Sequence, residues 1–209
     1  MNLPLSLPNL LTSLRIFLIP VLVLCFYLLP LDLRYLASAF IFSIASLTDW
    51  LDGYLARRMG QMTPFGAFLD PVADKLLVAV ALILLVEAHA SALLAIPALV
   101  IVGREIVVSA LREWMSTHSD RSGVRVSMVA KVKTGFQMTA IIVLLAQGPD
   151  LTAPLVILGY LLLYIAAGLT LWSMWQYLLI AWPDLSSGMQ SPRPDEGAEV
   201  SKASNTSRQ

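Results

Sequence analysis

The chain has 209 residues, of which 57% are hydrophobic and only 13% are charged, and its formal net charge is zero. A soluble domain has about 45–50% apolar and about 25% charged residues, so this composition excludes an ordinary water-soluble protein. The zero net charge carries no information about nucleic acid, and we expect no nucleic-acid partner. The length suits one compact bundle.

Six apolar runs are long enough to cross a membrane, because a spanning helix needs about 20 mostly apolar residues. Turn signals such as Pro30, Gly148 and Pro183 separate most of them. The sequence therefore predicts an all-α polytopic membrane protein with six transmembrane helices in one bundle. The runs cover about residues 10–30, 35–57, 69–88, 92–114, 129–147 and 153–181.

The distribution of Lys and Arg predicts the orientation, because cytoplasmic loops carry an excess of both. Arg57 and Arg58 lie between the second and third runs, and Arg121 and Arg125 lie between the fourth and fifth, whereas the loops of the opposite side hold only Arg34. We therefore expect both termini to face the cytoplasm. Residues 1–182 form the predicted membrane domain. Residues 183–209 are rich in Ser, Pro, Gly and charge and are predicted to be a disordered cytoplasmic tail.

Two pairs of aspartates flank the loop between the second and third runs. Asp49 and Asp52 are three residues apart, and Asp70 and Asp74 are four apart, so each pair shares one face of its helix. A short reversing loop joins the two helices, which predicts that the four carboxylates converge at one site at the edge of the membrane. Ordinary helix-end charges give no reason for two pairs spaced in this way.

Four like charges at the edge of a low-dielectric region are costly unless cations neutralise them. Oxygen ligands without a nearby His or Cys favour hard ions, chiefly Mg²⁺, with Mn²⁺ or Ca²⁺ as alternatives. Two such ions balance four carboxylates and suit phosphoryl transfer, because they stabilise both the attacking and the leaving oxygen. Gly53 and Gly66 leave room for a phosphate near the backbone, and Arg57 offers it a planar set of donors.

Two other classes of protein could carry such aspartates. A cation transporter needs carboxylates near the middle of the bilayer, often on broken helices, whereas these lie at helix ends beside an arginine. A non-catalytic membrane scaffold gives no reason for the aspartate pairs. Group transfer with divalent metals is therefore the favoured hypothesis.

The string D-x-x-D-G-x-x-A-R, followed by G-x-x-x-D-x-x-x-D, spans Asp49 to Asp74 and resembles the signature of the CDP-alcohol phosphatidyltransferase family at every defined position. The resemblance covers about residues 1–182. It implies that the aspartates bind two divalent ions and CDP-diacylglycerol, with Asp49 and Asp70 shared between the ions and Asp52 and Asp74 each completing one. It also implies that Asp74 accepts the proton of the alcohol.

The resemblance also implies contacts to the CDP-lipid in and before the first spans. The element Pro8-Asn9 to Arg15 looks like a second family motif, within which Arg15 is either a topology anchor or a substrate residue. The residues that match the positions for CDP-diacylglycerol are Asn9, Thr12, Asp49, Asp52, Gly53, Ala56, Arg57, Thr63 and Gly66.

A second group of charges lies on the fourth and fifth runs. Arg104 and Glu105 stand within a span, which makes them functional candidates. Arg104 and Arg112 are about two helical turns apart, and Lys131 and Lys133 begin the next helix, so the four basic residues predict a pocket for an anionic acceptor. These stretches resemble members of the family whose acceptor is sn-glycerol 3-phosphate, although those usually carry Gly where Ala130 stands.

The expected activity is therefore the transfer of a phosphatidyl group from CDP-diacylglycerol to sn-glycerol 3-phosphate, which releases CMP. Inositol phosphate, serine and phosphatidylglycerol are the alternative acceptors. From the family we also expect Mg²⁺ as cofactor, contact with membrane lipids, a homodimer, and a place in a bacterial inner membrane with the active site facing the cytoplasm.

Overall fold

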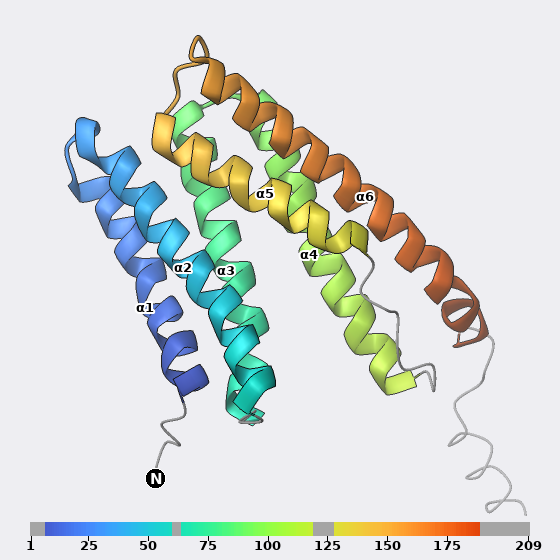
Figure 1. The fold of residues 1–209 in the computed structure, drawn as a ribbon. Coiled ribbons are helices and arrows are strands. Elements are labelled where there is room, and N and C mark those ends of the chain that lie inside the picture. Colours follow the sequence, from blue (N-terminus) through green and yellow to red (C-terminus); the bar gives the residue numbers. More distant parts are fainter. Residues whose placement is uncertain (1–6, 60–63, 119–127, 189–209) are drawn as a thin grey trace, which may run out of the picture.

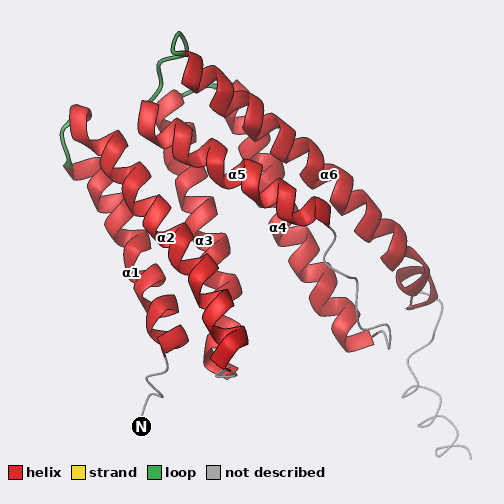
Figure 2. Cartoon of the chain, viewed as in Figure 1, coloured by secondary structure: helices red, strands yellow, loops and turns green. Residues whose placement is uncertain are grey.

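A computed structural model describes residues 7–59, 64–118 and 128–188, and all regular structure in these ranges is helical (Figure 2). The all-α prediction is confirmed for this part of the chain. The six helices are α1 (Leu7–Leu28), α2 (Leu31–Met59), α3 (Pro64–His89), α4 (Ala92–His118), α5 (Met128–Gln147) and α6 (Pro154–Gly188).

Three short connections lie at one end of the bundle, and the beginning of α1 and the end of α6 lie at the other end (Figure 1). The connection between α5 and α6 begins at Gly148, which has a φ of 69°. A Cβ at this position would lie 2.9 Å from the Tyr35 ring, so both the backbone angle and the close approach of α2 require glycine.

Four helices are long and apolar enough to cross a membrane: α1, α2, α4 and α6. In α3, the charged residues Asp74 and Lys75 lie toward one end and Glu87 near the other, and in α5 the apolar stretch covers only Val132–Gln147. These four apolar helices indicate a membrane protein. The count of six spans stays a prediction.

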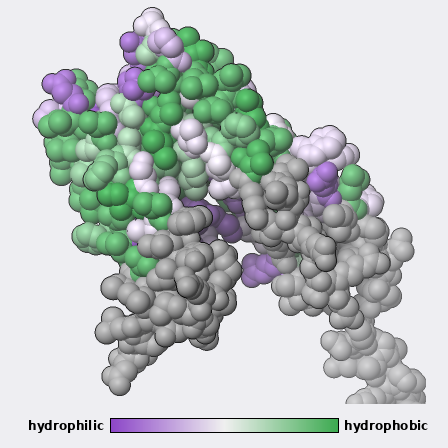
Figure 3. Space-filling model, in the orientation of Figure 1, coloured by the Kyte–Doolittle hydropathy of each residue, from purple (hydrophilic) through white to green (hydrophobic). Residues whose placement is uncertain are grey.

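The core is formed by residues of all six helices, with Leu22, Phe42, Leu82 and Leu144 almost fully buried. Large apolar side chains, among them Phe40, also remain exposed on the outside of the bundle. Hydrophobic residues, shown in green, cover much of the described surface in Figure 3. An apolar outer surface of this extent fits contact with lipid chains.

The last helix differs from the sequence-based boundary. We expected a turn at Pro183 and a disordered tail from there, but α6 continues to Gly188. A proline inside a helix removes one backbone hydrogen bond without having to end the helix, and long membrane helices tolerate it. Residues 189–209 of the predicted tail lie outside the described residues.

Candidate active site

The aspartate cluster, which we define as Asp49, Asp70 and Asp74, lies on α2 and α3, about two to three turns inside the helix ends that face each other along the chain. Asp70 and Asp74 are four residues apart on α3 and therefore share one face of this helix. The cluster lies at the same end of the bundle as the beginning of α1. Thr12 and Arg15, one helical turn apart on α1, therefore come within reach of it.

Arg15 connects two of these aspartates. Its side chain is fully buried, and its Nη1 lies 2.9 Å from Oδ1 of Asp49 and 3.7 Å from Oδ1 of Asp70. The hydroxyl of Thr12 donates a hydrogen bond of 2.8 Å to the same Asp70 oxygen. A topology anchor extends its guanidinium toward the head groups, whereas Arg15 turns inward, so the carboxylates decide its position.

Asp74 lies one turn further into α3. It is close enough to interact electrostatically with Asp49 and Arg15, and also with Lys75 and Glu105. Asp74 is therefore linked electrostatically both to Asp49 of the aspartate cluster and to Glu105 of α4. This position brings the two groups of charges singled out in the sequence to one region of the molecule.

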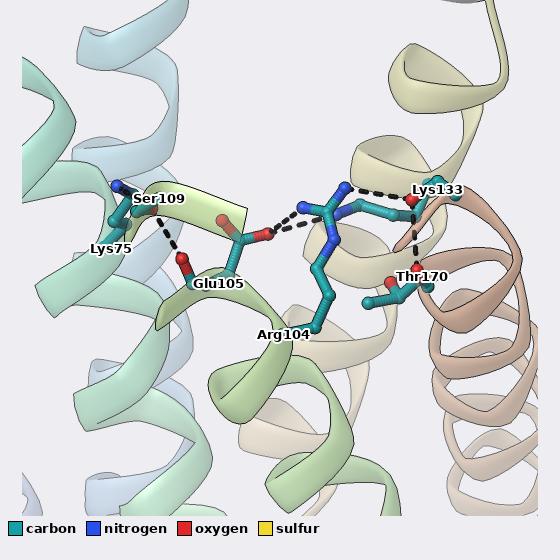
Figure 4. Close-up of polar contacts among 7 residues, drawn as sticks. Lys75, Arg104, Glu105, Ser109, Lys133 and Thr170 are labelled. Carbon is teal, nitrogen blue, oxygen red and sulfur yellow. Dashed lines mark hydrogen bonds and ion pairs between the residues drawn. The ribbon is translucent and has the colours of Figure 1, made fainter. Parts of the chain in front are cut away.

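The basic cluster, which we define as Arg104, Lys133 and their counter-ion Glu105, lies between α4 and α5 (Figure 4). Oε1 of Glu105 accepts a hydrogen bond of 2.9 Å from Nη1 of Arg104 and one of 3.1 Å from Nζ of Lys133. Arg104 also donates a hydrogen bond of 2.9 Å to Oγ of Ser173 on α6. Both cations are nearly buried.

A further contact links the basic cluster to α3. Nζ of Lys75 donates to Oγ of Ser109, and that hydroxyl donates to the backbone carbonyl of Glu105 (Figure 4). Lys75 directly follows Asp74 in the chain. The α3–α4 contact therefore holds Asp74 and Glu105 in a fixed relation.

An open groove of about 380 Å³ runs along α3 and α4 beside this contact. Lys75, Glu105 and Ser109 form its polar part, and the remaining wall is apolar, with Leu76 and Ile106 among the lining residues. A groove that combines a charged part with apolar walls suits an amphipathic molecule such as a lipid.

The family follows from comparison with known sequences. The sequence model of the CDP-alcohol phosphatidyltransferases matches residues 5–172. The chain belongs to this family. The match includes both helices of the aspartate cluster and those of the basic cluster.

Three bacterial relatives that are each named CDP-diacylglycerol–glycerol-3-phosphate 3-phosphatidyltransferase resemble the chain along most of its length. The relative from Pseudomonas fluorescens is 58% identical over 87% of this chain and 93% of its own length. The relative from Yersinia pestis strain Pestoides F is 52% identical over 87% and 97%. The relative from Shigella flexneri serotype 5b is 51% identical over 86% and 97%.

CDP-alcohol phosphatidyltransferases generally use divalent metal ions, and the donor set of the aspartate cluster suits one. Asp49 and Asp70 already approach a common cation, the Arg15 guanidinium, and their oxygens are the ligands that hard divalent ions prefer. Among the described side chains, however, no three acidic, His or Cys residues are close enough to hold an ion together. The convergence is therefore seen for Asp49 and Asp70, while a site formed by all four aspartates stays a prediction.

Several predicted site residues lie outside the described residues or side chains. Thr63 falls in the undescribed segment 60–63. Gly66 is half-buried in the first turn of α3. For seven other predicted site residues, the structure describes the helical backbone but not the surroundings. These residues are Asn9, Asp52, Gly53, Ala56, Arg57, Arg112 and Lys131.

The sequence did not single out Ser173, Ser109 or Lys75 as site residues. In the structure Ser173 accepts a hydrogen bond from Arg104. Lys75 donates to Ser109, which donates to the backbone carbonyl of Glu105. Ser173 offered a signal, because it and Thr170 are polar residues one turn apart in an otherwise apolar part of α6. Ser173 Oγ donates to the Thr170 carbonyl and accepts from Arg104, so the polar pair marks the α6 position that faces the basic cluster.

Proposed function

We propose that this CDP-alcohol phosphatidyltransferase transfers the phosphatidyl group of CDP-diacylglycerol to sn-glycerol 3-phosphate, giving phosphatidylglycerol phosphate and CMP. The observation that supports an acceptor with a phosphate is the pair of nearly buried cations, Arg104 and Lys133, which both bind Glu105, a residue that interacts electrostatically with Asp74. An acceptor that carries a phosphate needs such a positive site beside the base, whereas serine or a lipid acceptor does not. The names of the relatives support the same acceptor.

We propose that the cofactor is a pair of Mg²⁺ ions, for which Mn²⁺ can substitute. Asp49 and Asp70 are the proposed shared ligands, and Asp52 and Asp74 each complete one ion. When bound, the ions neutralise charge on the phosphoryl oxygens and on the leaving group. The acidic oxygens that converge on Arg15 support this ligand set.

The residues of the chain have separate proposed tasks in the reaction. Arg57, with Gly53, Ala56, Thr63 and Gly66, holds the cytidine diphosphate, and Asn9 contacts the CDP-lipid. Thr12 belongs to the same set, and its hydrogen bond to Asp70 indicates that it also orients this carboxylate. This arrangement fixes the phosphorus that carries the diacylglycerol, and positioning of this kind accounts for most of the catalysis in phosphoryl transfer.

The acceptor then reacts next to Asp74. Arg104, Arg112, Lys131 and Lys133 bind its phosphate, and the carboxylate of Asp74 takes the proton of the 1-hydroxyl. The hydroxyl oxygen forms a bond to the phosphorus, the bond between that phosphorus and the CMP oxygen breaks, and CMP leaves with the electron pair. Arg57 stabilises the negative charge that grows on the phosphoryl oxygens.

A CMP-release assay with the purified full chain tests the proposal. We expect release from CDP-diacylglycerol with sn-glycerol 3-phosphate and little release with serine, inositol phosphate or phosphatidylglycerol. A preference for one of those acceptors would leave the proposed phosphatidyl transfer in place but would identify a different acceptor. Absence of release with every acceptor would reject the transferase.

The basic cluster predicts a selective kinetic defect. Lys133→Gln removes one charge-assisted contact to the acceptor phosphate, which is worth about 1.5–3 kcal/mol. We expect the KM for glycerol 3-phosphate to rise by roughly tenfold to a hundredfold, while the KM for CDP-diacylglycerol changes little. Steady-state kinetics with each substrate varied in turn measures both constants.

Arg34→Gln is the matched control, because Arg34 lies at the opposite end of the bundle and stacks on Phe26 and Tyr35. Both KM values should stay at the wild-type level. An unchanged acceptor KM in Lys133→Gln would assign the basic cluster to helix packing. A rise in the KM for CDP-diacylglycerol alone would assign it to the other substrate.

We also propose the arrangement of the chain in its membrane. Residues 1–182 form the catalytic domain with six spans, both termini and the active site face the cytoplasm of a bacterial inner membrane, and the residues after the end of α6 at Gly188 form a tail. The chain acts as a homodimer in contact with membrane lipids. Single cysteines at Arg34 and Arg121 should react with an impermeant thiol reagent from the periplasm and the cytoplasm respectively, and the reverse pattern would invert the topology.

A further inference from the structure

Arg15 is a buried cation that the proposed reaction leaves without a task. Its side chain has no exposure, and it lies within the first candidate span, Leu11–Leu28. An arginine keeps its proton in a protein, so a buried guanidinium needs anionic partners. Arg15 finds them in Asp49 of α2 and Asp70 of α3. It therefore binds together the two helices that carry the proposed metal ligands.

The two carboxylates are not enclosed by this contact. About two-fifths of each side chain stays exposed, 41% for Asp49 and 42% for Asp70. Arg15 approaches from the protein side, and Thr12 on the same face of α1 donates to Asp70. The carboxylates thus have a fixed cation on one side and an accessible side left for another ligand.

We propose that Arg15 is a positioning residue that holds Asp49 and Asp70 in place and shares their negative charge with the divalent ions. This inference rests on the metal site of the proposed function. Because Arg15 and the ions are attracted to the same two carboxylates and repel each other, the charge of Arg15 weakens metal binding while it stabilises the protein when metal is absent.

This role makes a prediction that a purely structural role does not make. A ligand that binds only the folded protein stabilises it more as its affinity rises. Loss of the Arg15 charge leaves the carboxylates without their counter-ion, so the variant is less stable without metal and gains more from metal. If Arg15 only packs the helices, its loss lowers the unfolding temperature equally with and without metal.

The experiment compares Arg15→Gln with the wild type by thermal unfolding of the full chain in detergent, with EDTA and across a MgCl₂ titration without substrate. We expect Arg15→Gln to unfold at a lower temperature in EDTA, to gain a larger shift from Mg²⁺, and to reach half of this shift at a roughly tenfold lower Mg²⁺ concentration. Folding of the variant only in the presence of Mg²⁺ would be the extreme form of this result.

Two further variants separate charge from packing. We call the Mg²⁺ concentration that gives half of the stabilising shift the half-point. Arg15→Lys keeps the charge, so its half-point should stay within about twofold of the wild type. Arg34→Gln removes a cation early in α2, at the opposite end of the bundle, and its half-point should also stay unchanged. If Arg15→Gln does not fold in any condition, Arg15→Lys alone tests the inference. A roughly tenfold difference between its half-point and that of the wild type would then overturn the inference.

The remaining outcomes distinguish the two proposals. A wild-type chain that shows no Mg²⁺ shift would reject the metal site and the inference with it. A wild-type shift that Arg15→Gln reproduces in size and half-point would retain the metal site and reject charge sharing. A shift that disappears in Arg15→Gln would also reject charge sharing, because it would make Arg15 necessary for metal binding.

Discussion

Asp49→Asn is expected to abolish turnover. Asparagine keeps the size of the side chain but removes the negative charge that faces Arg15 and that the proposal shares between both ions. Removal of a single electrostatic group at a reaction centre commonly costs about 10²–10³ in kcat, and a shared ligand affects two ions, so we expect a loss of at least about 10³. Asp70→Asn should behave in the same way.

CMP release at saturating substrates and Mg²⁺ measures this loss. Asp32→Asn is the control, because Asp32 is an exposed residue in the first turn of the same helix, at the opposite end of the bundle. Turnover above a tenth of the wild-type value in Asp49→Asn would remove this residue from the metal site.

Metal removal should give the same result by another route. The wild-type enzyme in excess EDTA is expected to be inactive and to recover when Mg²⁺ is added. Full activity of a preparation shown to be free of metal would contradict the two-ion proposal, whatever the aspartate variants do.

The helices were predictable because apolar runs of membrane length leave few alternatives. The runs predicted at about residues 92–114 and 129–147 correspond closely to α4 and α5. The end of α6 was not predictable from Pro183, because a proline only lowers helix stability and cannot by itself fix where a helix ends. Local hydropathy alone does not decide whether α3 and α5 cross the membrane, because it does not describe how the whole bundle lies in the bilayer.

The candidate site was predictable where the spacing is local. Asp49 with Asp52, and Asp70 with Asp74, are pairs on single helices, so the helical repeat sets their faces. The partner of Arg15 was not predictable, because the contact joins different helices and depends on how α1 packs against α2 and α3. The same holds for Glu105, whose two cations come from its own helix and from α5.

Asp74→Asn should separate proton transfer from substrate binding. Its carboxylate is the proposed base, and asparagine cannot accept the proton, so turnover should fall by several orders of magnitude. Asp49, Asp52 and Asp70 remain, so CDP-diacylglycerol should still bind, which a thermal shift with this lipid in the presence of Mg²⁺ measures. Glu87→Gln, toward the opposite end of α3, should leave both readouts unchanged.

The two readouts decide which role Asp74 has. Loss of turnover with lipid binding retained assigns the proton to Asp74, whereas loss of both makes it chiefly a metal ligand. Near-normal turnover in Asp74→Asn would require another base or solvent. Lys75 is poorly placed for that task, because its ammonium already donates to Ser109, away from the aspartates and toward α4. Asp74 interacts electrostatically with both Asp49 and Glu105, so it has a neighbour in the proposed donor site and one beside the proposed acceptor site, as the proposed base requires.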